Sequence, residues 1–514
     1  MYLYNFIKLI KRLVSKIIIM GLGLLLLVSV GKENIYLSSE PEITFFKIAY
    51  KRHTNFSIET VSQYFKSTPD FGRKVTVNLS KTADLLGGIY LYVELPDIIK
   101  ENHSTLPTGI KNFAWVKKIG LALLNYVDLE IGGILIDRHF GDYLNIWGEL
   151  VINLGLKKGL NKMLGNVDIL TNYSNGKNSY KLYIPLNFWF CHDSGLALPI
   201  IAMVHNDIKI HVQFNDFNKC YIQSPTHYVK TVEPFTLFKK GEIIRQTVGN
   251  QNIIGKFTYF DGIKGILYYD KIKDDFLIPS KNDDINYIIT GDETNFQQNI
   301  LSSEIIIKDE DYFRFNLPSI QNSYLLVNYI YLDNDERFIF INNEHEYLVP
   351  VVQNIQEQTF YSTNISYKIP YYNPIKIIFW RAQLLSNYNS NDLFNYTLDP
   401  IVSISNKIIE TENVVLNSIN RMELNKSEYY TYIQVYQNKF VSPPDGIHMF
   451  SFGINPAEYQ PSGTLNFSKI DDAFIKINCN KLVNYQNPIL LRSYGIQLNL
   501  FRVINGLGGL GYYA

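Results

Sequence analysis

From about residue 35 onward, short apolar runs alternate with clusters of polar turn residues along most of the chain. The runs are rich in Val, Ile, Tyr and Phe, and Asn, Asp, Gly, Ser and Pro separate them, as in antiparallel strands joined by turns. In the run DIKIHVQF at 207–214, apolar and polar residues alternate one by one. This alternation predicts a strand with one face in a hydrophobic core. Similar runs lie at 74–79, 88–95, 126–131, 324–332 and 473–478.

Helix candidates are few, and the best are two adjacent segments, 140–150 and 151–164. No rhythm of alternating strands and helices is visible, which disfavours a parallel α/β enzyme fold. The stretch from Asn218 to about Ser319 differs in texture, because it is rich in Lys, Asp and Ile and its strands lack obvious partners. We therefore predict a mostly antiparallel β protein with an insertion or a large surface excursion in this stretch.

The composition and charge of the chain exclude some classes of protein. The 514 residues include 48 basic and 48 acidic side chains, so the formal net charge is zero, and 46% of the residues are hydrophobic. A disordered chain would combine low hydrophobicity with high net charge, and a general nucleic-acid binder would carry a basic excess. The length allows two or three domains. Balanced charge permits dense self-association, and 38 Tyr and 31 Phe residues suit surfaces that become buried against other surfaces.

The cysteines exclude a disulfide framework. Cys191, Cys220 and Cys479 are widely spaced, odd in number and free of any CxxC pair, so neither a disulfide scaffold nor a zinc site is indicated. We expect buried thiols in a protein of a reducing compartment.

Two segments invite a metal or nucleophile interpretation that the pattern does not favour. His205, Asp207 and His211 lie close together in the sequence. His205 precedes the predicted strand and His211 lies on its polar face, so structural roles are favoured over a metal site. The HDSG segment at 192–195 is flanked by turn residues and is typical of a turn rather than of a catalytic serine.

Two further segments resemble ligand-binding loops. The GLGGLG segment at 506–511 lacks the Lys-Ser/Thr pair of a phosphate loop, which favours a packed C-terminal tail. The LDNDER segment at 332–337 has too few ligands for a calcium loop, and a solvated turn with Arg337 pairing locally is favoured. We predict no catalytic, cofactor-binding or metal-ligating residues. The four tryptophans are expected to be core or interface anchors: Trp115, Trp147, Trp189 and Trp380.

The N-terminus admits two interpretations. Basic residues precede an uncharged run at 17–31, which is shorter than the about 20 residues that a membrane-spanning helix needs. Together they resemble a signal peptide, with small residues at Ser29 and Gly31 near a possible cleavage point. The other interpretation, given below, depends on Met20.

Six segments, taken in order, resemble one family. They lie at 41–57, 126–150, 182–214, 327–353, 446–470 and 494–511, and include YVDLEIGGILIDRHF, NDIKIHVQF, VNYIYLDNDERFIF and GINPAEYQPSGTLNF. The chain resembles the major capsid proteins of nucleocytoplasmic large DNA viruses, the group that includes iridoviruses, phycodnaviruses and mimivirus-like giants. The resemblance spans nearly all of 20–514 outside 218–319.

The resemblance implies an all-β fold of two tandem eight-stranded antiparallel jelly rolls with a few short helices. It places the first jelly roll at 35–336, with the insertion at about 218–319 facing outward. It places a linker at 337–344 and the second jelly roll at 345–514. In the Pro- and Gly-punctuated segment 455–467, an ordered turn between strands is favoured over a contact between subunits.

The resemblance also changes the interpretation of the N-terminus. Family members tend to begin with Met-Gly and a short apolar segment, which Met20 and Gly21 match. We therefore predict that residues 1–19 are a non-native extension and that 20–34 form an N-terminal arm.

The implied function is structural, without enzymatic activity or cofactors. The expected protein is a homotrimer whose pseudo-hexagonal capsomers tile an icosahedral virion shell, assembled in the host cytoplasm. Expected partners are further copies, minor capsid or cement proteins and, near the arm, an internal viral membrane, with no direct contact to nucleic acid. Two alternatives stay open: a secreted or membrane-anchored carbohydrate-binding or hydrolysing β-sandwich, and a minor capsid-like paralogue.

Overall fold

The computed structural model describes residues 31–98, 113–174, 176–223, 225, 227–239, 241–249, 251–262, 265–277, 287–301, 318–398, 406–420 and 425–512. The chain divides into two compact units, residues 1–55 and 56–514. In the first unit, the short helix α3 (Lys32–Ser38) precedes a segment without strands. The predicted extension at 1–19 lies outside the described residues, as does most of the predicted arm. Among the described residues, no helix has the length and apolar character needed to cross a membrane.

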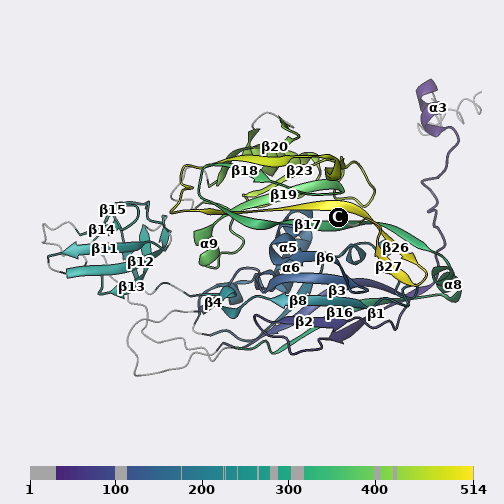
Figure 1. Cartoon of the computed structure of the whole chain (residues 1–514), viewed down its shortest axis with the longest axis horizontal. Helices are drawn as coiled ribbons and strands as arrows, with labels where there is room; N and C mark the ends of the chain where they lie inside the picture. Colours follow the sequence, from purple (N-terminus) through teal and green to yellow (C-terminus); the bar gives the residue numbers. More distant parts are fainter. Residues whose placement is uncertain are drawn as a thin grey trace, which may run out of the picture. The chain divides into compact units, whose positions relative to one another are not determined.

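The second unit begins with an eight-stranded antiparallel sandwich (Figure 1). One sheet has the order β1–β16–β3–β7 and the other β2–β8–β5–β6. A glycine pair with positive φ, Gly132 at 60° and Gly133 at 84°, forms the tight turn between β5 and β6. The strands are β1 (Phe56–Tyr64), β2 (Lys74–Asn78), β3 (Leu85–Leu95), β5 (Leu124–Ile131), β6 (Ile134–Phe140), β7 (Tyr180–Pro185), β8 (Ile208–Phe214) and β16 (Asn322–Leu332).

A second sandwich repeats this topology. Its sheets have the orders β17–β26–β19–β23 and β18–β25–β20–β21, and β22, β24 and β27 pair alongside them. When only the eight strands of the two orders are numbered along the chain, the first, eighth, third and sixth share one sheet in both sandwiches. The all-β double jelly roll predicted from the sequence is confirmed. The strands are β17 (His345–Phe360), β18 (Asn364–Lys368), β19 (Pro374–Leu384), β20 (Ile409–Leu416), β21 (Ile419–Asn420), β22 (Asn425–Lys426), β23 (Ile447–Ser451), β24 (Leu465–Asn466), β25 (Ala473–Cys479), β26 (Ile489–Ile504) and β27 (Leu507–Leu510).

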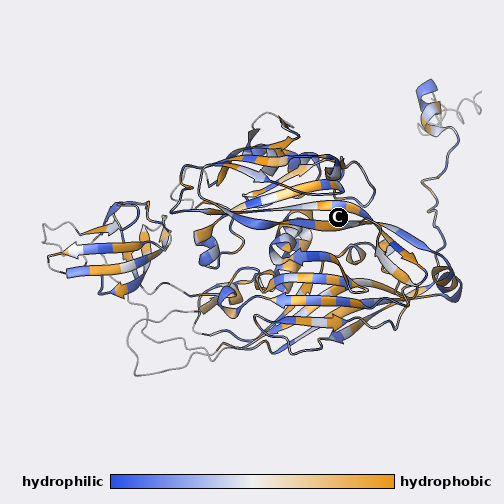
Figure 2. Ribbon diagram, in the orientation of Figure 1, coloured by the Kyte–Doolittle hydropathy of each residue, from blue (hydrophilic) through white to orange (hydrophobic). Residues whose placement is uncertain are grey.

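Alternating hydropathy along the strands builds the cores, as Figure 2 shows. In β8 the predicted alternation is confirmed, since every second residue from Ile208 to Phe214 is buried. One core cluster fills the first sandwich and continues onto the second, and another fills the interior of the second. Burial of branched and aromatic side chains between paired sheets is the main stabilising contribution in such folds.

A separate sheet is inserted between β8 and β16, and Figure 1 shows it beside the sandwiches. Its order is β10–β13–β12–β11–β14–β15, and it has a hydrophobic core of its own that includes Phe257, Tyr269 and Phe276. All these strands lie within the predicted insertion at 218–319. They are β10 (His227–Lys230), β11 (Ile243–Val248), β12 (Gln251–Asp261), β13 (Ile266–Lys273), β14 (Ile288–Gly291) and β15 (Gln297–Asn299); β4 (Phe113–Trp115) pairs with β9 (Tyr221–Gln223) at its base.

Two helices lie where the spacing of apolar residues predicted them. Helices α5 (Gly141–Val151) and α6 (Leu154–Met163) confirm the two predicted helical segments. Helix α8 (Asn334–Asn342) occupies most of the segment predicted as a linker. Shorter helices are α4 (Ile119–Ala122), α7 (Asp168–Thr171), α9 (Leu385–Asn389), α10 (Gln434–Gln437), the 3-10 helices η1 (Trp189–Cys191), η2 (Ser194–Leu196), η3 (Phe217–Lys219) and η5 (Phe467–Lys469), and the π-helix η4 (Tyr429–Ile433).

The predicted turn at LDNDER is instead the start of α8, and the predicted local pairing of Arg337 is wrong. Asp333 caps the helix by accepting a hydrogen bond from the Asn334 amide at 2.7 Å. The guanidinium of Arg337 pairs with Asp84, with Nε 3.0 Å from Oδ1. Asp84 is buried and distant in sequence, so only the packing of the loop before β3 against α8 could bring the two charges together.

Candidate functional site

An extended polar network lies where the two jelly rolls meet. Figure 1 places α5 of the first jelly roll beside the outer face of the second, next to β17. Tyr143 of α5 lies 5.9 Å from Phe379 of β19 and 5.6 Å from Tyr494 of β26, measured between ring centroids. Trp147, one turn further along α5, lies 6.2 Å from the Phe379 ring. These rings join the two sandwiches through one hydrophobic core.

A buried ion cluster crosses the same interface. The guanidinium of Arg381, on β19, donates from Nε to Asp142 Oδ2 of α5 at 2.9 Å and from Nη2 to Glu357 Oε1 of β17 at 2.5 Å. Only 4% of the Arg381 side chain is exposed. Burial by itself would lower its pKa, but Asp142 and Glu357 outweigh this effect and hold the pKa above its ordinary value. The cation is therefore paired from both jelly rolls.

Polar contacts extend this cluster along α5. The Tyr396 hydroxyl donates to Asp142 and accepts a hydrogen bond from Asn145 Nδ2 at 3.4 Å. Asn145 Oδ1 in turn accepts a hydrogen bond from Lys118 Nζ at 2.5 Å, and Lys118 also pairs with Glu149. Although burial raises the pKa of Glu149, the ammonium groups beside it hold that pKa below the ordinary value. One face of α5 is thereby fixed by charge and the other by aromatic packing.

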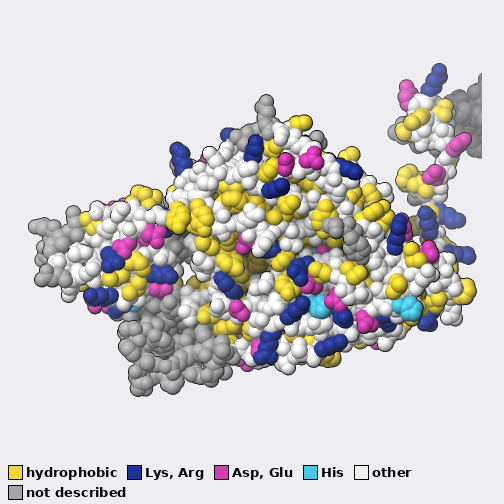
Figure 3. All heavy atoms as spheres, in the orientation of Figure 1, with side chains coloured by type: hydrophobic (Ala, Val, Ile, Leu, Met, Phe, Trp, Pro, Cys, Tyr) yellow, Lys and Arg dark blue, Asp and Glu magenta, His cyan; other side chains and the backbone are white. Residues whose placement is uncertain are grey.

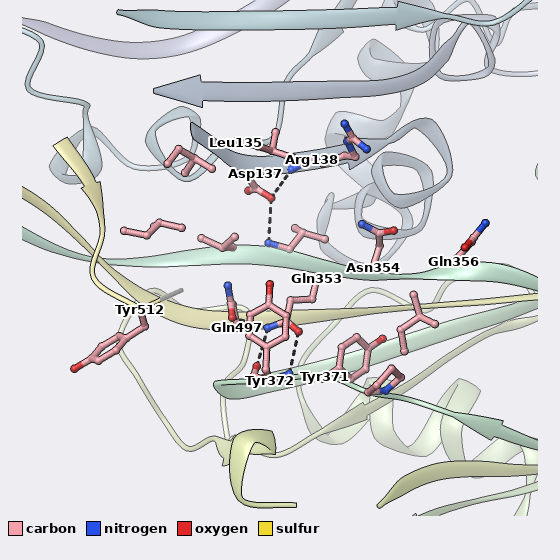
Figure 4. Close-up of a pocket in the computed structure, with 16 residues that line it drawn as sticks. Leu135, Asp137, Arg138, Gln353, Asn354, Gln356, Tyr371, Tyr372, Gln497 and Tyr512 are labelled. Atoms are coloured by element: carbon pink, nitrogen blue, oxygen red, sulfur yellow. Dashed lines mark hydrogen bonds between the residues drawn. The ribbon is translucent and has the colours of Figure 1, made fainter. Parts of the chain in front are cut away.

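The edge strands β6 and β17 meet through a buried carboxylate. Asp137 Oδ1 accepts a hydrogen bond from the Val352 amide at 3.2 Å, and Asp137 Oδ2 lies 3.0 Å from His139 Nε2. Figure 4 shows the adjoining cavity, of about 450 Å³, with Asp137 on one side and Gln353 on the other. Gln353 is held by Gln497 and by the Tyr372 backbone. The bonded edges cannot pair with other strands there.

The glycine-rich C-terminal segment docks on the first jelly roll, in agreement with the predicted packed tail. Asn505 and Gly506, with φ of 50° and 79°, form the turn between β26 and β27. The Gly506 carbonyl accepts a hydrogen bond from the His205 amide at 3.0 Å. The Gly508 amide donates to Asn206 Oδ1 at 3.2 Å. The tail adds a third bonded contact between the jelly rolls.

The structure separates the candidate residues of the predicted motifs. His205 lies against the C-terminal turn, whereas His211 bonds to Thr76 Oγ1 at 2.8 Å and Glu130 Oε2 at 2.9 Å on the first sandwich. Asp193 accepts a hydrogen bond from the Gly195 amide at 2.8 Å and caps η2, as the turn interpretation of HDSG predicts. Among the described residues, no group of three or more His, Cys, Asp or Glu side chains is placed to hold a metal ion.

Sequence reasoning missed the charged residues of the interface. The signal that could have found Arg381 is its place as the charged residue in the mostly apolar run IIFWRAQLL, since a charge in a buried strand requires a partner. The partners of Arg381 could not be recognised from the sequence, because an acidic residue such as Asp142 is common in the first turn of a helix. Of the predicted anchors, Trp115, Trp189 and Trp380 are fully buried and Trp147 is partly buried in the joint core.

The exposed surface combines charges of both signs with apolar side chains, as the face in Figure 3 shows. The edge strand β1 exposes Phe56, Ile58 and Tyr64, and α8 exposes Phe338 and Ile339. Exposed apolar groups at a sheet edge and on a helix are typical of surfaces that other proteins cover.

Two joined jelly rolls of the same topology define the class of double jelly-roll capsid proteins. The chain is 36% identical to "Probable capsid protein 4" of Acanthamoeba polyphaga mimivirus, over 95% of this chain and 99% of the relative. Residues 44–238 match the family model "Major capsid protein N-terminus", and residues 336–509 match "Large eukaryotic DNA virus major capsid protein". The chain belongs to the family of major capsid proteins of large eukaryotic DNA viruses.

Solved structures agree with the fold. The Faustovirus major capsid protein has a TM-score of 0.66 at 14% identity, covering 92% of this chain and 94% of that chain. The PBCV-1 VP54 protein, fitted into a reconstruction of the virophage Sputnik, has a TM-score of 0.62 at 22% identity, covering 92% and 100%. Membership of the family gives the chain the structural role of a capsid protein in the virion shell.

Proposed function

We propose that three copies of this chain form a ring in which six jelly rolls make a pseudo-hexagonal capsomer, and that these capsomers tile an icosahedral shell. The observation that carries the proposal is the repeat of one sheet order in two sandwiches locked by Arg381, Asp142 and Glu357. A threefold ring of such a pair presents six similar sides, and the ring closes through head-to-tail contacts. A rigid joint keeps those sides at a constant angle.

In this proposed function, the protein acts through its shape and its contacts and carries out no catalysis. Zero net charge supports close packing of many copies, since no repulsion accumulates in the shell, and it argues against direct nucleic-acid binding. The insertion at 218–319 would face outward, and the N-terminal arm would face an internal membrane. Minor capsid or cement proteins are further proposed partners, and the host cytoplasm is the proposed place of assembly.

The domain boundaries stay a prediction. The strands of the first sandwich lie within the predicted 35–336 and those of the second within 345–514, and α8 occupies most of the linker at 337–344. The separate core of the inserted sheet supports its assignment as a subdomain.

The test is the assembly state of the purified full-length chain. Light scattering after size exclusion should give three times the mass of one chain, and cryo-electron microscopy at high protein concentration should show hexagonal arrays. A monomer that binds glycans would contradict the proposal and favour the carbohydrate-binding sandwich. As a control, Arg502→Met changes an exposed ion pair and should leave the trimer intact.

A major capsid protein is distinguished from a minor paralogue by abundance. Quantitative mass spectrometry of purified virions should place this chain among the most abundant proteins. A copy number far below that of another double jelly-roll chain in the same virion would favour the minor role.

A further inference from the structure

A second cavity, of about 240 Å³, lies between the two jelly rolls. Residues around η1 and η2 of the first jelly roll form one wall, and the outer face of β17, β19 and β26 of the second forms the other. Its apolar lining includes Trp147 and Trp189 on the first side and Leu348, Pro350 and Ile496 on the second. An apolar lining of this kind favours a hydrophobic ligand body over water.

One ammonium group in this cavity has no partner. Lys376, on β19, lines the cavity, and among the described residues its side chain makes no hydrogen bond and no ion pair. Burial lowers the pKa of Lys376 to about 8, so at neutral pH the group is still mostly cationic. Lys376 is half-buried, and a cation withdrawn from water in this way is destabilising unless an anion is placed beside it.

The carboxylates around the cavity are engaged elsewhere or exposed. Asp137 accepts hydrogen bonds from the Arg138 and Val352 amides at 2.9 and 3.2 Å and lies 3.0 Å from the His139 ring. Asp193 caps η2 and Glu458 is exposed at the rim. None of these carboxylates is bonded to Lys376 among the described residues, so its ammonium group is available to an anion from outside the chain.

Two imidazoles add to the basic character of the cavity. His139 is 1% exposed, and its Nδ1 is buried without a hydrogen-bond partner. His192 lies on the rim, with Nε2 3.3 Å from the Asn187 carbonyl oxygen. Desolvation lowers the pKa of His192, the hydrogen bond to the Asn187 carbonyl opposes this, and electrostatic interactions with His139 and Lys376 lower it further. The three basic groups are therefore within electrostatic range of one another.

We propose that this cavity binds a small amphipathic carboxylate, with its anionic head on Lys376. Its apolar body would lie between the side that holds Trp147 and Trp189 and the side that holds Leu348, Pro350 and Ile496. The volume fits a molecule of roughly 10 to 15 non-hydrogen atoms, because cavities of about 150 Å³ hold benzene. Such a ligand touches both jelly rolls, so it stabilises their joint by mass action. The proposal does not depend on the assembly proposed above.

Calorimetry with matched probes tests the site on the full-length chain at pH 7. Sodium octanoate should bind with one site per chain and raise the unfolding temperature. The neutral 1-octanol should bind at least about tenfold more weakly, and sodium acetate, which has a head but no body, should not bind. Equal affinity for octanoate and octanol would overturn the proposal, as would the absence of octanoate binding.

Variants assign the binding to this cavity. Lys376→Met should remove the preference for octanoate over octanol, and Lys376→Gln serves as a second variant that keeps a polar head. Lys368→Met, at an exposed lysine on the opposite sheet, is the matched control and should keep the preference. Leu196→Phe, which fills the cavity, should block both probes. Unchanged octanoate affinity in a folded Lys376 variant would place the ligand elsewhere and overturn the assignment.

Discussion

Arg381 Nε of the second jelly roll lies 2.9 Å from Asp142 Oδ2 of the first, and 4% of the arginine side chain and 14% of the aspartate side chain are exposed. This ion pair and the aromatic packing of α5 determine how the two sandwiches are joined.

Removal of the Arg381 guanidinium should destabilise the chain strongly. In Arg381→Met, the carboxylates of Asp142 and Glu357 lose their shared cation while they stay largely buried, which typically costs about 3–5 kcal/mol of unfolding free energy. Denaturant unfolding measures the change. Arg502→Met, in an exposed pair with Glu346, should cost less than about 1 kcal/mol. Similar losses in both variants would show that the buried pair has no special role.

The start of α5 tolerates only glycine. A Cβ at Gly141 would overlap the backbone carbonyl oxygens of Leu121 and Leu124, the second at 2.6 Å, and backbone cannot move aside as a flexible side chain can. Gly141→Ala should therefore displace α5 and lower the unfolding free energy by about 1–3 kcal/mol or more. Gly148→Ala on the same helix meets its neighbours at 3.6 Å and should raise stability by up to about 1 kcal/mol. A destabilised Gly148→Ala with a neutral Gly141→Ala would contradict this packing.

The pH dependence of the unfolding free energy should show the lowered pKa of Lys376. Its pKa is about 8 in the folded chain and 10.5 ordinarily, so between these values the unfolded chain binds the extra proton. The contribution of Lys376 to stability therefore rises with pH through this window and is lowest below pH 8. Lys376→Met should stabilise the apo chain at pH 7 by up to about 3 kcal/mol, and this advantage should shrink toward pH 10.5. A difference between the two chains that is constant over pH 7–10.5 would contradict the shift.

The thiols should be unreactive in the folded chain. Burial raises the pKa of Cys191 and of Cys479 to about 12, and it also raises the pKa of Cys220. Since the thiolate is the reactive form, Ellman's reagent at pH 8 should label the native chain slowly. The same chain in guanidinium chloride, the control, should release three equivalents at once. Rapid labelling under native conditions would show that the thiols are accessible.

The inserted sheet should open more readily than the sandwiches. Its core is small and separate, and fewer buried contacts give lower protection against local unfolding. Hydrogen exchange should show faster deuterium uptake in β10–β15 than in β3, β8 and β26. Equal protection would indicate that the inserted sheet and the jelly rolls unfold as one unit.

Local patterns of apolar and polar residues predicted many of the strands and helices. Alternation in 207–214 was sufficient to predict β8 and its buried face, and the spacing in 140–164 was sufficient for α5 and α6. These predictions succeed because the period of apolar residues reflects which face of a single element is buried. The order of six segments along the chain was sufficient to indicate the double jelly roll and its family.

Contacts between distant residues were decided by tertiary structure alone. Arg337 was predicted to pair locally and instead meets Asp84, Arg381 meets Asp142 across the joint, and Lys376 faces a cavity that neither jelly roll forms alone. No pattern within one element encodes such pairs, because the energy of a charge depends on which groups and how much solvent surround it after packing. The sequence by itself determined the elements and their class. The packing of one sandwich on the other decided that Arg381 meets Asp142 and that Lys376 faces the cavity without a partner among the described residues.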